Sequence, residues 1–200
     1  LNNIDQELIS KIKNCNTFIS GVPGSLNIGS KYNNNSFFVE QCPDDTYNYK
    51  IEDSSKRYDT VFIGNIFGEI HKERSFFLKD SKIHHFRNIF GQAHNQLVNQ
   101  TRINLNFSPL DRSGCSVRVH KILASAGFLM TTPWSGIEKS FKVGEELVCF
   151  NTKKEMQEKI DYYLRNEQER QKIANAGHKK VQTYMPNIWA KNILKYTIGL

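Results

Sequence analysis

Residues Ser116–Thr131 read SVRVHKILASAGFLMT, and this stretch decides the fold. Its first part has the apolar periodicity of an amphipathic helix, and Ser116 has a side chain suited to capping the helix start. The helix ends near Gly127 and the chain turns at once into an apolar run, which predicts a buried strand. We expect a helix placed in this way to border a ligand site, with His120 and Lys121 at its site-facing centre.

The same alternation of strand and helix extends outward from this stretch, starting at Tyr58. Short, β-branched apolar runs predict strands, and the segments between them have helical periodicity. Strands alternating with helices at short spacing predict a Rossmann-like α/β fold, a right-handed parallel sheet flanked by helices. The expected strands are YDTVFIGNI, KIHHFRNIF, INLNFS, FLMTT and LVCFN, and the expected helices are EIHKERSFFLKD, QAHNQLVNQT, SVRVHKILASA and IEKSF.

From Thr152 onward the pattern is helical, which predicts a helical C-terminal tail. Thr152 is a suitable N-cap, and Glu155 completes a capping box. Gly177 is an interior break or a packing point, and Pro186 stops a helix before a last one, NIWAKNILKYTI.

Residues 1–56 differ from the rest of the chain, because they are rich in Asn, Ser, Gly and Asp. Their two short apolar patches, TFISGV and SFFVEQ, predict strands joined by loops, and they bury too little surface to fold alone. We therefore divide the chain into residues 1–56 and 57–200.

Composition narrows the choice of partner. The chain has 200 residues and a formal net charge of +7, which favours a phosphate-bearing small molecule, a nucleic acid or an acidic membrane surface. The basic residues are spread out with no run of five, so a nucleic-acid partner is disfavoured.

No apolar run has the length of a membrane span. The chain starts with Leu and shows no leader, which fits a fragment of a longer protein; we expect a cytoplasmic location, with a membrane surface as the alternative.

Cysteines and histidines show no pattern typical of a metal or redox site. The cysteines form no CxxC pair, and the histidines neither pair with Cys nor have HExxH spacing. No Ser-His-Asp or Cys-His arrangement can be read from their order. We expect buried, unreactive cysteines, no metal, and chemistry that relies on positioning and charge stabilisation. The cysteines are Cys15, Cys42, Cys115 and Cys149.

Three loops follow expected strands and could bind a ligand, because ligands of open parallel sheets bind at the carboxyl ends of strands. In GNIFGE, Gly64 lets backbone amides approach a phosphate, although a simple tight turn is an equal alternative. In SPLDRSGCSVR, Arg112 and Arg118 lie beside a helix start that suits a diphosphate, although Arg118 could instead pair with a neighbouring acid. In TTPWSGIEKSF, we expect Trp134 to pack rather than to cover a ligand.

The string from Ile103 to Val181 resembles the C-terminal domain of GT-B glycosyltransferases, in the group 1 superfamily and closest to its spore-maturation-protein-B-like branch. The matching segments are RVHKILASAGFLMT, GIEKSFKVGEELVCF and KKEMQEKIDYYLRNEQERQKIANAGHKKV. The resemblance covers residues 58–194, and YDTVFIGNI is similar to the first strand of that domain. Residues 1–56 resemble the tail of the preceding acceptor-side domain and its linker.

This resemblance implies a hexosyltransferase-like enzyme of glycan biosynthesis. It would transfer sugar from a nucleoside-diphosphate sugar to an unidentified glycan, protein or lipid acceptor, with no tightly bound cofactor. Residues 57–200 would bind the nucleotide sugar, and a missing acceptor domain or partner chain would complete the enzyme. Arg118 is the implied catalytic residue, and the implied donor-binding residues are Gly64, Asn65, Phe90, Gly91, Gly114, Cys115, Ser116, Val117 and Lys121.

The sequence departs from the family at two positions. Family members usually carry Glu where Lys121 stands, and retaining enzymes of the wider superfamily carry an earlier Glu where this chain has Ser113. Lysine offers only hydrogen-bond donors, so it cannot accept hydrogen bonds from sugar or ribose hydroxyls. The alternative hypothesis is therefore a catalytically degenerate domain that keeps the nucleotide pocket or only an interaction surface.

Overall fold

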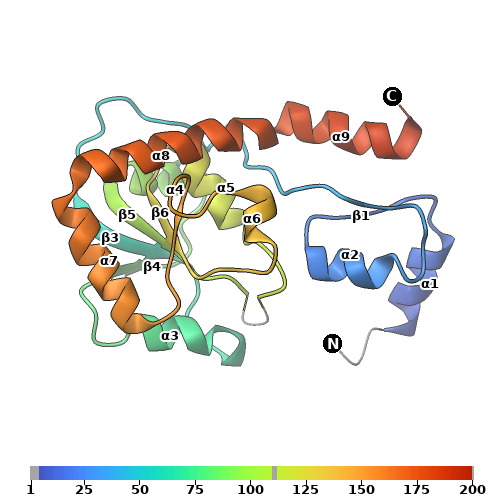
Figure 1. The fold of residues 1–200 in the computed structure, drawn as a ribbon, viewed down its shortest axis with the longest axis horizontal. Coiled ribbons are helices and arrows are strands. Elements are labelled where there is room, and N and C mark those ends of the chain that lie inside the picture. Colours follow the sequence, from blue (N-terminus) through green and yellow to red (C-terminus); the bar gives the residue numbers. More distant parts are fainter. Residues whose placement is uncertain (1–4, 110–111, 200) are drawn as a thin grey trace.

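A computed structural model describes residues 5–109 and 112–199, and its main body is a five-stranded parallel sheet (Figure 1). The strands run in the order β4-β3-β5-β6-β7, so the predicted parallel α/β sheet is confirmed. The chain moves from β3 to β4 on one side and returns to β5 on the other, which makes the carboxyl ends of β3 and β5 a topological switch point. The strands are β3 (Tyr58–Ile63), β4 (His84–Phe86), β5 (Thr101–Asn106), β6 (Leu129–Thr131) and β7 (Val148–Cys149).

Alternating side chains on the strands build a core on each face of the sheet. In β3, Val61 and Ile63 join one apolar cluster with Leu123, whereas Phe62 joins the other with Phe107. Burial on both faces explains the nearly continuous apolar runs in these strands. The covering helices are η1 (Glu69–His71), α3 (Lys72–Leu78), α4 (Gly91–Asn99), α5 (Val117–Ala124), α6 (Ile137–Ser140), α7 (Lys153–Arg165) and α8 (Glu167–Val181).

The predicted capping box at the start of α7 is present. The Thr152 hydroxyl accepts a hydrogen bond from the Glu155 amide at 3.1 Å, and the Glu155 carboxylate accepts one from the Asn151 amide at 2.7 Å. The Thr152 half of the capping box is thus as predicted, while the Glu155 carboxylate reaches the amide of Asn151, one residue before the N-cap.

Gly177 is a packing point within α8. A Cβ atom at this position would lie 2.3 Å from the carbonyl oxygen of Glu146 and 2.8 Å from Leu123 Cδ2. We expect Gly177→Ala to lower the free energy of unfolding by about 1–3 kcal/mol, because the overlap outweighs the higher helix propensity of alanine. Urea unfolding measures the change, and Gln168→Ala on the exposed side of α8 is the control. Equal stabilities of the two variants would contradict this packing.

The N-terminal segment forms a small separate unit that corrects the prediction of strands and loops alone. Its two patches are strands that pair in parallel, but two helices accompany them. The first begins at Asp5, whose side chain accepts a hydrogen bond from the Glu7 amide, and the second has Pro23 in its first turn. Ile12 of α1 and Gly29 of α2 are the buried residues of these helices, so few of their apolar side chains enter a core. The elements are α1 (Gln6–Asn14), β1 (Phe18–Ser20), α2 (Pro23–Gly29) and β2 (Ser36–Phe38).

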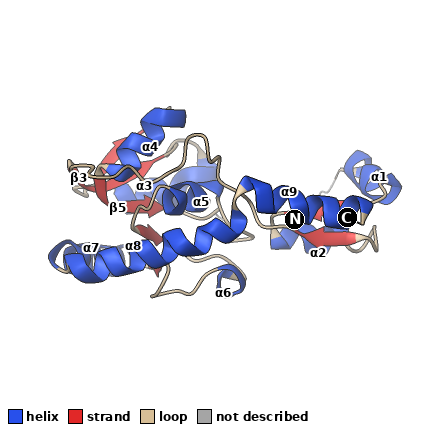
Figure 2. Cartoon of the chain, turned by 90° about the horizontal axis from the view of Figure 1, so that it is seen from above, coloured by secondary structure: helices blue, strands red, loops and turns tan. Residues whose placement is uncertain are grey.

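The end of the helical tail crosses back to this unit. After η2 (Gln182–Tyr184), helix α9 (Pro186–Ile198) leaves the sheet domain and lies along β1 and α2 in both views (Figures 1 and 2). The rings of Phe37 and Tyr196 stack at 4.2 Å between centroids, and the Thr17 hydroxyl donates to the Tyr196 carbonyl at 3.4 Å. The tail therefore joins the two parts of the chain. Among the described helices, none combines the length and the apolar character that a membrane crossing requires.

Candidate functional site

A cavity of about 440 Å³ opens at the carboxyl ends of β3 and β4 beside the start of α5. We call it the α5 cavity. It borders the switch point between β3 and β5, since Arg118 in its wall donates to Asn106 at the end of β5, and a ligand is expected there. Seven of the predicted site residues line it, from three separate loops: Gly64, Asn65, Phe90, Ser116, Val117, Arg118 and Lys121.

Arg118 is the central charge of the α5 cavity. Its Nη1 donates to Asn106 Oδ1 at 2.9 Å, and its guanidinium lies 5.3 Å from the centre of the Phe62 ring. Burial lowers the pKa of Arg118 to about 10, with a smaller contribution from Arg74. Among the described residues, no carboxylate lies within ion-pairing distance of this guanidinium. A desolvated cation without a counter-charge favours binding of an anion.

Gly64 allows the Arg118 side chain to reach this position. A Cβ atom on Gly64 would lie 2.8 Å from both Arg118 Nη2 and Phe62 Cζ. The Gly64 carbonyl oxygen is held 2.7 Å from His85 Nε2, which fixes the backbone of this loop. The absence of a side chain on Gly64 therefore lets Arg118 and Phe62 pack against the backbone, in addition to allowing a turn.

The start of α5 adds its own positive potential. Ser116 caps the helix, since its side chain accepts a hydrogen bond from the Arg118 amide at 3.3 Å. The first N–H groups of a helix lack partners within the helix and carry partial positive charge. Arg87 and Lys121 also line the cavity, and no acidic residue is among the lining residues that the structure describes. The cavity is thus built for an anionic group.

His94, on α4, contributes a buried ring to the same wall. Its pKa is lowered from 6.5 to about 4, mainly by burial and also by Lys121 and Arg118. At neutral pH the ring is therefore uncharged, and its Nδ1 has no hydrogen-bond partner in the part of the chain that the structure describes. A neutral imidazole beside an anion can offer one N–H donor.

The low pKa of His94 predicts a loss of stability in acid. Between pH 6.5 and about pH 4, His94 binds a proton in the unfolded chain but not in the native one. The free energy of unfolding is therefore unaffected by this group above pH 6.5 and decreases as the pH falls toward 4. Between pH 7 and pH 4, we expect the free energy of unfolding to fall by roughly 2–3 kcal/mol less in His94→Gln than in wild type. Urea unfolding at several pH values measures this, and parallel curves for the two proteins would refute it.

A smaller cavity of about 250 Å³ adjoins the α5 cavity and shares Phe90, His94 and Lys121 with it. We call it the Tyr47 cavity. Predicted residue Gly91 lies here, at the first turn of α4, and a Cβ atom on it would meet the Tyr47 ring at 3.7 Å. Asp44 and Asn48, which form a turn in the linker, complete its wall. A flat ring could enter beside Tyr47 and Phe90.

Four residues of the loop and helix lie elsewhere than the sequence suggests. Gly114 packs against Val22 of the N-terminal unit, and Cys115 lines a third cavity. Arg112 pairs with Glu73 and also donates to the Pro133 carbonyl, so it is not free for the α5 cavity. The site-facing position expected for His120 is wrong, because its ring is fully buried against Glu40.

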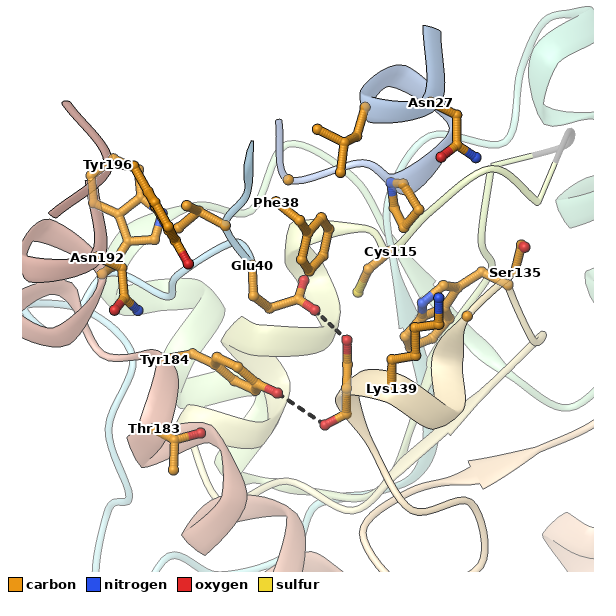
Figure 3. Close-up of a pocket in the computed structure, with 18 residues that line it drawn as sticks. Asn27, Phe38, Glu40, Cys115, Ser135, Lys139, Thr183, Tyr184, Asn192 and Tyr196 are labelled. Atoms are coloured by element: carbon orange, nitrogen blue, oxygen red, sulfur yellow. Dashed lines mark hydrogen bonds between the residues drawn. The ribbon is translucent and has the colours of Figure 1, made fainter. Parts of the chain in front are cut away.

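The third cavity, of about 530 Å³, lies between the N-terminal unit, α6 and α9 (Figure 3). We call it the Glu40 cavity. Trp134 packs at its edge and is buried, as expected, with its ring against Phe141. The Ser140 hydroxyl donates to the Glu40 carboxylate, and the Tyr184 hydroxyl donates to the Ser140 carbonyl at 3.0 Å. Cys115 and Glu40 both face the cavity.

Several residues that shape the α5 cavity were not predicted from the sequence. Asn106 orients Arg118 and also donates to the Thr131 hydroxyl at 2.9 Å. The Phe62 ring packs against the face of the Arg118 guanidinium. The available signal for Asn106 is its place as the last residue of β5, next to the loop that leads to α5. His94 and Arg87 gave no such signal, because His94 lies in a segment with ordinary helical periodicity and Arg87 lies in an expected strand.

Comparisons with known proteins agree with this architecture. A family model described as "Glycosyl transferase-like" matches residues 38–194. A glycosyltransferase from Rickettsia africae ESF-5 superposes with a TM-score of 0.68 and 13% identity, over 98% of this chain and 68% of that one. Anabaena HepE in complex with UDP-glucose superposes with a TM-score of 0.74 and 10% identity, over 98% of this chain and 67% of that one. TarM superposes with a TM-score of 0.68 and 10% identity, over 98% of this chain and 48% of that one. A search of curated protein sequences found no match.

Proposed function

Because the chain belongs to the glycosyl transferase-like family, we propose that it binds a nucleoside-diphosphate sugar in the α5 cavity and transfers the sugar to an acceptor. The observation that carries this proposal is the Arg118 guanidinium, which is desolvated, fixed by Asn106 and without a carboxylate partner among the described residues. A diphosphate supplies the missing negative charge. The complex of HepE with UDP-glucose supports a donor of this class.

The diphosphate would lie between Arg118 and the start of α5. Its oxygens would accept hydrogen bonds from the guanidinium and from the first-turn amides, as anions do at helix N-termini. These donors are fixed before the donor binds, so they can stabilise the charge that develops on the leaving diphosphate without reorganisation. Arg118 thereby takes the role of catalytic residue, and Gly64 and Asn65 close the opposite side.

The base and ribose would extend into the Tyr47 cavity. The rings of Tyr47 and Phe90 form its walls, and Lys121 stands where the two cavities meet. Lys121 can donate to a phosphate or a ribose oxygen but cannot accept from a hydroxyl. The contact made by the usual family carboxylate is therefore replaced by one to a phosphate oxygen.

The acceptor side of the enzyme would come from residues beyond those that form the sheet. The chain spans about half to two thirds of the length of the structures with which it superposes. We assign residues 1–56 to the end of an acceptor-side domain and residues 57–200 to the donor domain, and we keep the spore-maturation-protein-B-like branch as the proposed subfamily. A further domain or a partner chain would supply the acceptor site; one similar structure is a GtfA/B complex.

Lys121 gives a specific reason for a second candidate function. A domain that has lost the sugar-binding carboxylate could keep the anion site and serve as a nucleotide-binding or interaction module. Both functions would use the α5 cavity, and only the transferase would convert the nucleotide sugar to product.

A thermal-shift series with nucleoside diphosphates and nucleotide sugars tests the proposal. We expect at least one nucleoside diphosphate to raise the melting temperature, because a ligand that binds only the folded state stabilises it. Release of nucleoside diphosphate from the matching nucleotide sugar then separates transferase from degenerate module. No stabilisation by any of these compounds would overturn the donor site.

A further inference from the structure

Three metal-ligand side chains meet at the inner wall of the Glu40 cavity. His120 Nε2 lies 3.5 Å from Glu40 Oε1, and His120 Nδ1 lies 3.9 Å from Cys115 Sγ. One ligand atom from each residue can be chosen so that all three lie within 4.8 Å of one another. The spacing of these residues in the sequence gives no sign of the cluster, since the linker, the loop after β5 and helix α5 each contribute one.

The imidazole of this cluster has an unused nitrogen. His120 is fully buried, and its Nε2 has no hydrogen-bond partner among the residues that the structure describes. The rings of Phe141 and Tyr184 pack around it at 5.7 and 5.6 Å between centroids and prevent it from turning toward solvent. A buried polar atom left unsatisfied destabilises the folded state, so such an atom calls for an explanation.

Within the described ranges, no Lys or Arg side chain forms an ion pair with the carboxylate beside it. Glu40 is 9% exposed, and its hydrogen-bond donors are the Ser140 hydroxyl and the Gln41 amide, the latter at 3.2 Å. Burial raises the pKa of Glu40, and it raises the pKa of Cys115 well above its ordinary value.

We propose that Glu40, Cys115 and His120 bind a zinc ion. Thiolate, imidazole and carboxylate together suit zinc, whereas calcium and magnesium prefer oxygen ligands alone. Neighbouring ligands of a tetrahedral zinc ion lie roughly 3.3–3.7 Å apart, so the Glu40–His120 pair already has the required separation. Binding replaces the thiol proton of Cys115, which is released to solvent.

The Glu40 cavity leaves a fourth coordination position accessible. Glu40 and Cys115 both line the cavity, whereas His120 is not among its lining residues. A site with three protein ligands and one open position can hold water or a ligand atom that enters through the cavity. A Cys-His nucleophile is a poorer explanation of the same cluster, because Cys115 Sγ lies 3.9 Å from His120 Nδ1 and its thiol donates instead to the Ser116 carbonyl at 3.3 Å.

Cobalt substitution tests this site in the whole chain. After removal of metals with a chelator, we expect one Co²⁺ per chain to bind and to give a thiolate-to-cobalt charge-transfer absorption. Zinc should displace the cobalt and abolish that absorption. Cys115→Ser should remove the absorption, and it should weaken zinc binding by about 100-fold or more, since even loss of a supporting residue around a metal costs about 10–100-fold. Cys149→Ser, which alters a partly buried cysteine on β7, is the matched control and should leave both unchanged.

The cobalt spectrum of the unaltered chain keeps the test independent of mutant folding. Absence of a thiolate band in wild type overturns the proposal, and so does a band that persists in Cys115→Ser. His120→Gln provides the second ligand test, with cooperative urea unfolding as the check that the variant is folded. None of these readouts depends on nucleotide binding, so the zinc site and the donor site succeed or fail separately.

Discussion

Replacement of Arg118 by alanine is expected to weaken binding of a nucleoside diphosphate by about 100-fold. The change removes a guanidinium whose charge-assisted hydrogen bonds are worth about 1.5–3 kcal/mol, and it leaves the diphosphate facing a cavity with less positive charge. Calorimetric titration of the two proteins measures the ratio of dissociation constants.

The matched control for this variant is Arg102→Ala. Arg102 is an arginine on β5 that pairs with Asp59 at the surface, away from the α5 cavity. Its replacement should change the dissociation constant by less than about 2-fold, because exposed pairs contribute little and screened charges act weakly at a distance. Equal losses in both variants would show that the diphosphate responds only to net charge and would refute the specific role of Arg118.

Phe107→Ala is expected to have the largest effect on stability, a loss of about 3–5 kcal/mol in the free energy of unfolding. Phe107 is completely buried, and its ring contacts those of Phe62, Phe77 and Phe150 at 5.0, 5.4 and 5.9 Å between centroids. The cavity left behind would also free Phe62, which supports Arg118. Urea unfolding measures the first effect, and nucleotide titration the second.

Phe76→Ala serves as the comparison, because this phenylalanine on α3 is 62% exposed. We expect it to cost less than about 1 kcal/mol, since little apolar area leaves the core. A similar cost for the two substitutions would mean that the aromatic cluster behind the sheet is not packed as described.

The sheet could be predicted from the sequence because its strands are buried on both faces. Runs such as YDTVFIGNI place apolar side chains at consecutive positions, because both faces of the strand enter a core. The strands of the N-terminal unit are only partly buried and give a shorter pattern. Their unit also depends on the stacking of Phe37 on Tyr196 of α9, which lies far away in the sequence.

The same contrast holds for the candidate site. Arg118 could be found because it stands one turn into a helix that follows a strand, a position fixed by local pattern. The partners that orient it could not, since Asn106 and Phe62 reach Arg118 only through the register of β3 and β5. The direction of His120 was also beyond local pattern, because a helix face is identified only by what packs on it. Here that is Glu40, from the linker.

A crystal structure of the chain with a bound nucleoside diphosphate would test the central claim most directly. We predict phosphate oxygens within hydrogen-bonding distance of the Arg118 guanidinium and of the first-turn amides of α5, with the base beside Tyr47 and Phe90. Phosphates bound elsewhere, for example beside Lys139 in the Glu40 cavity, would contradict the assignment of the donor site.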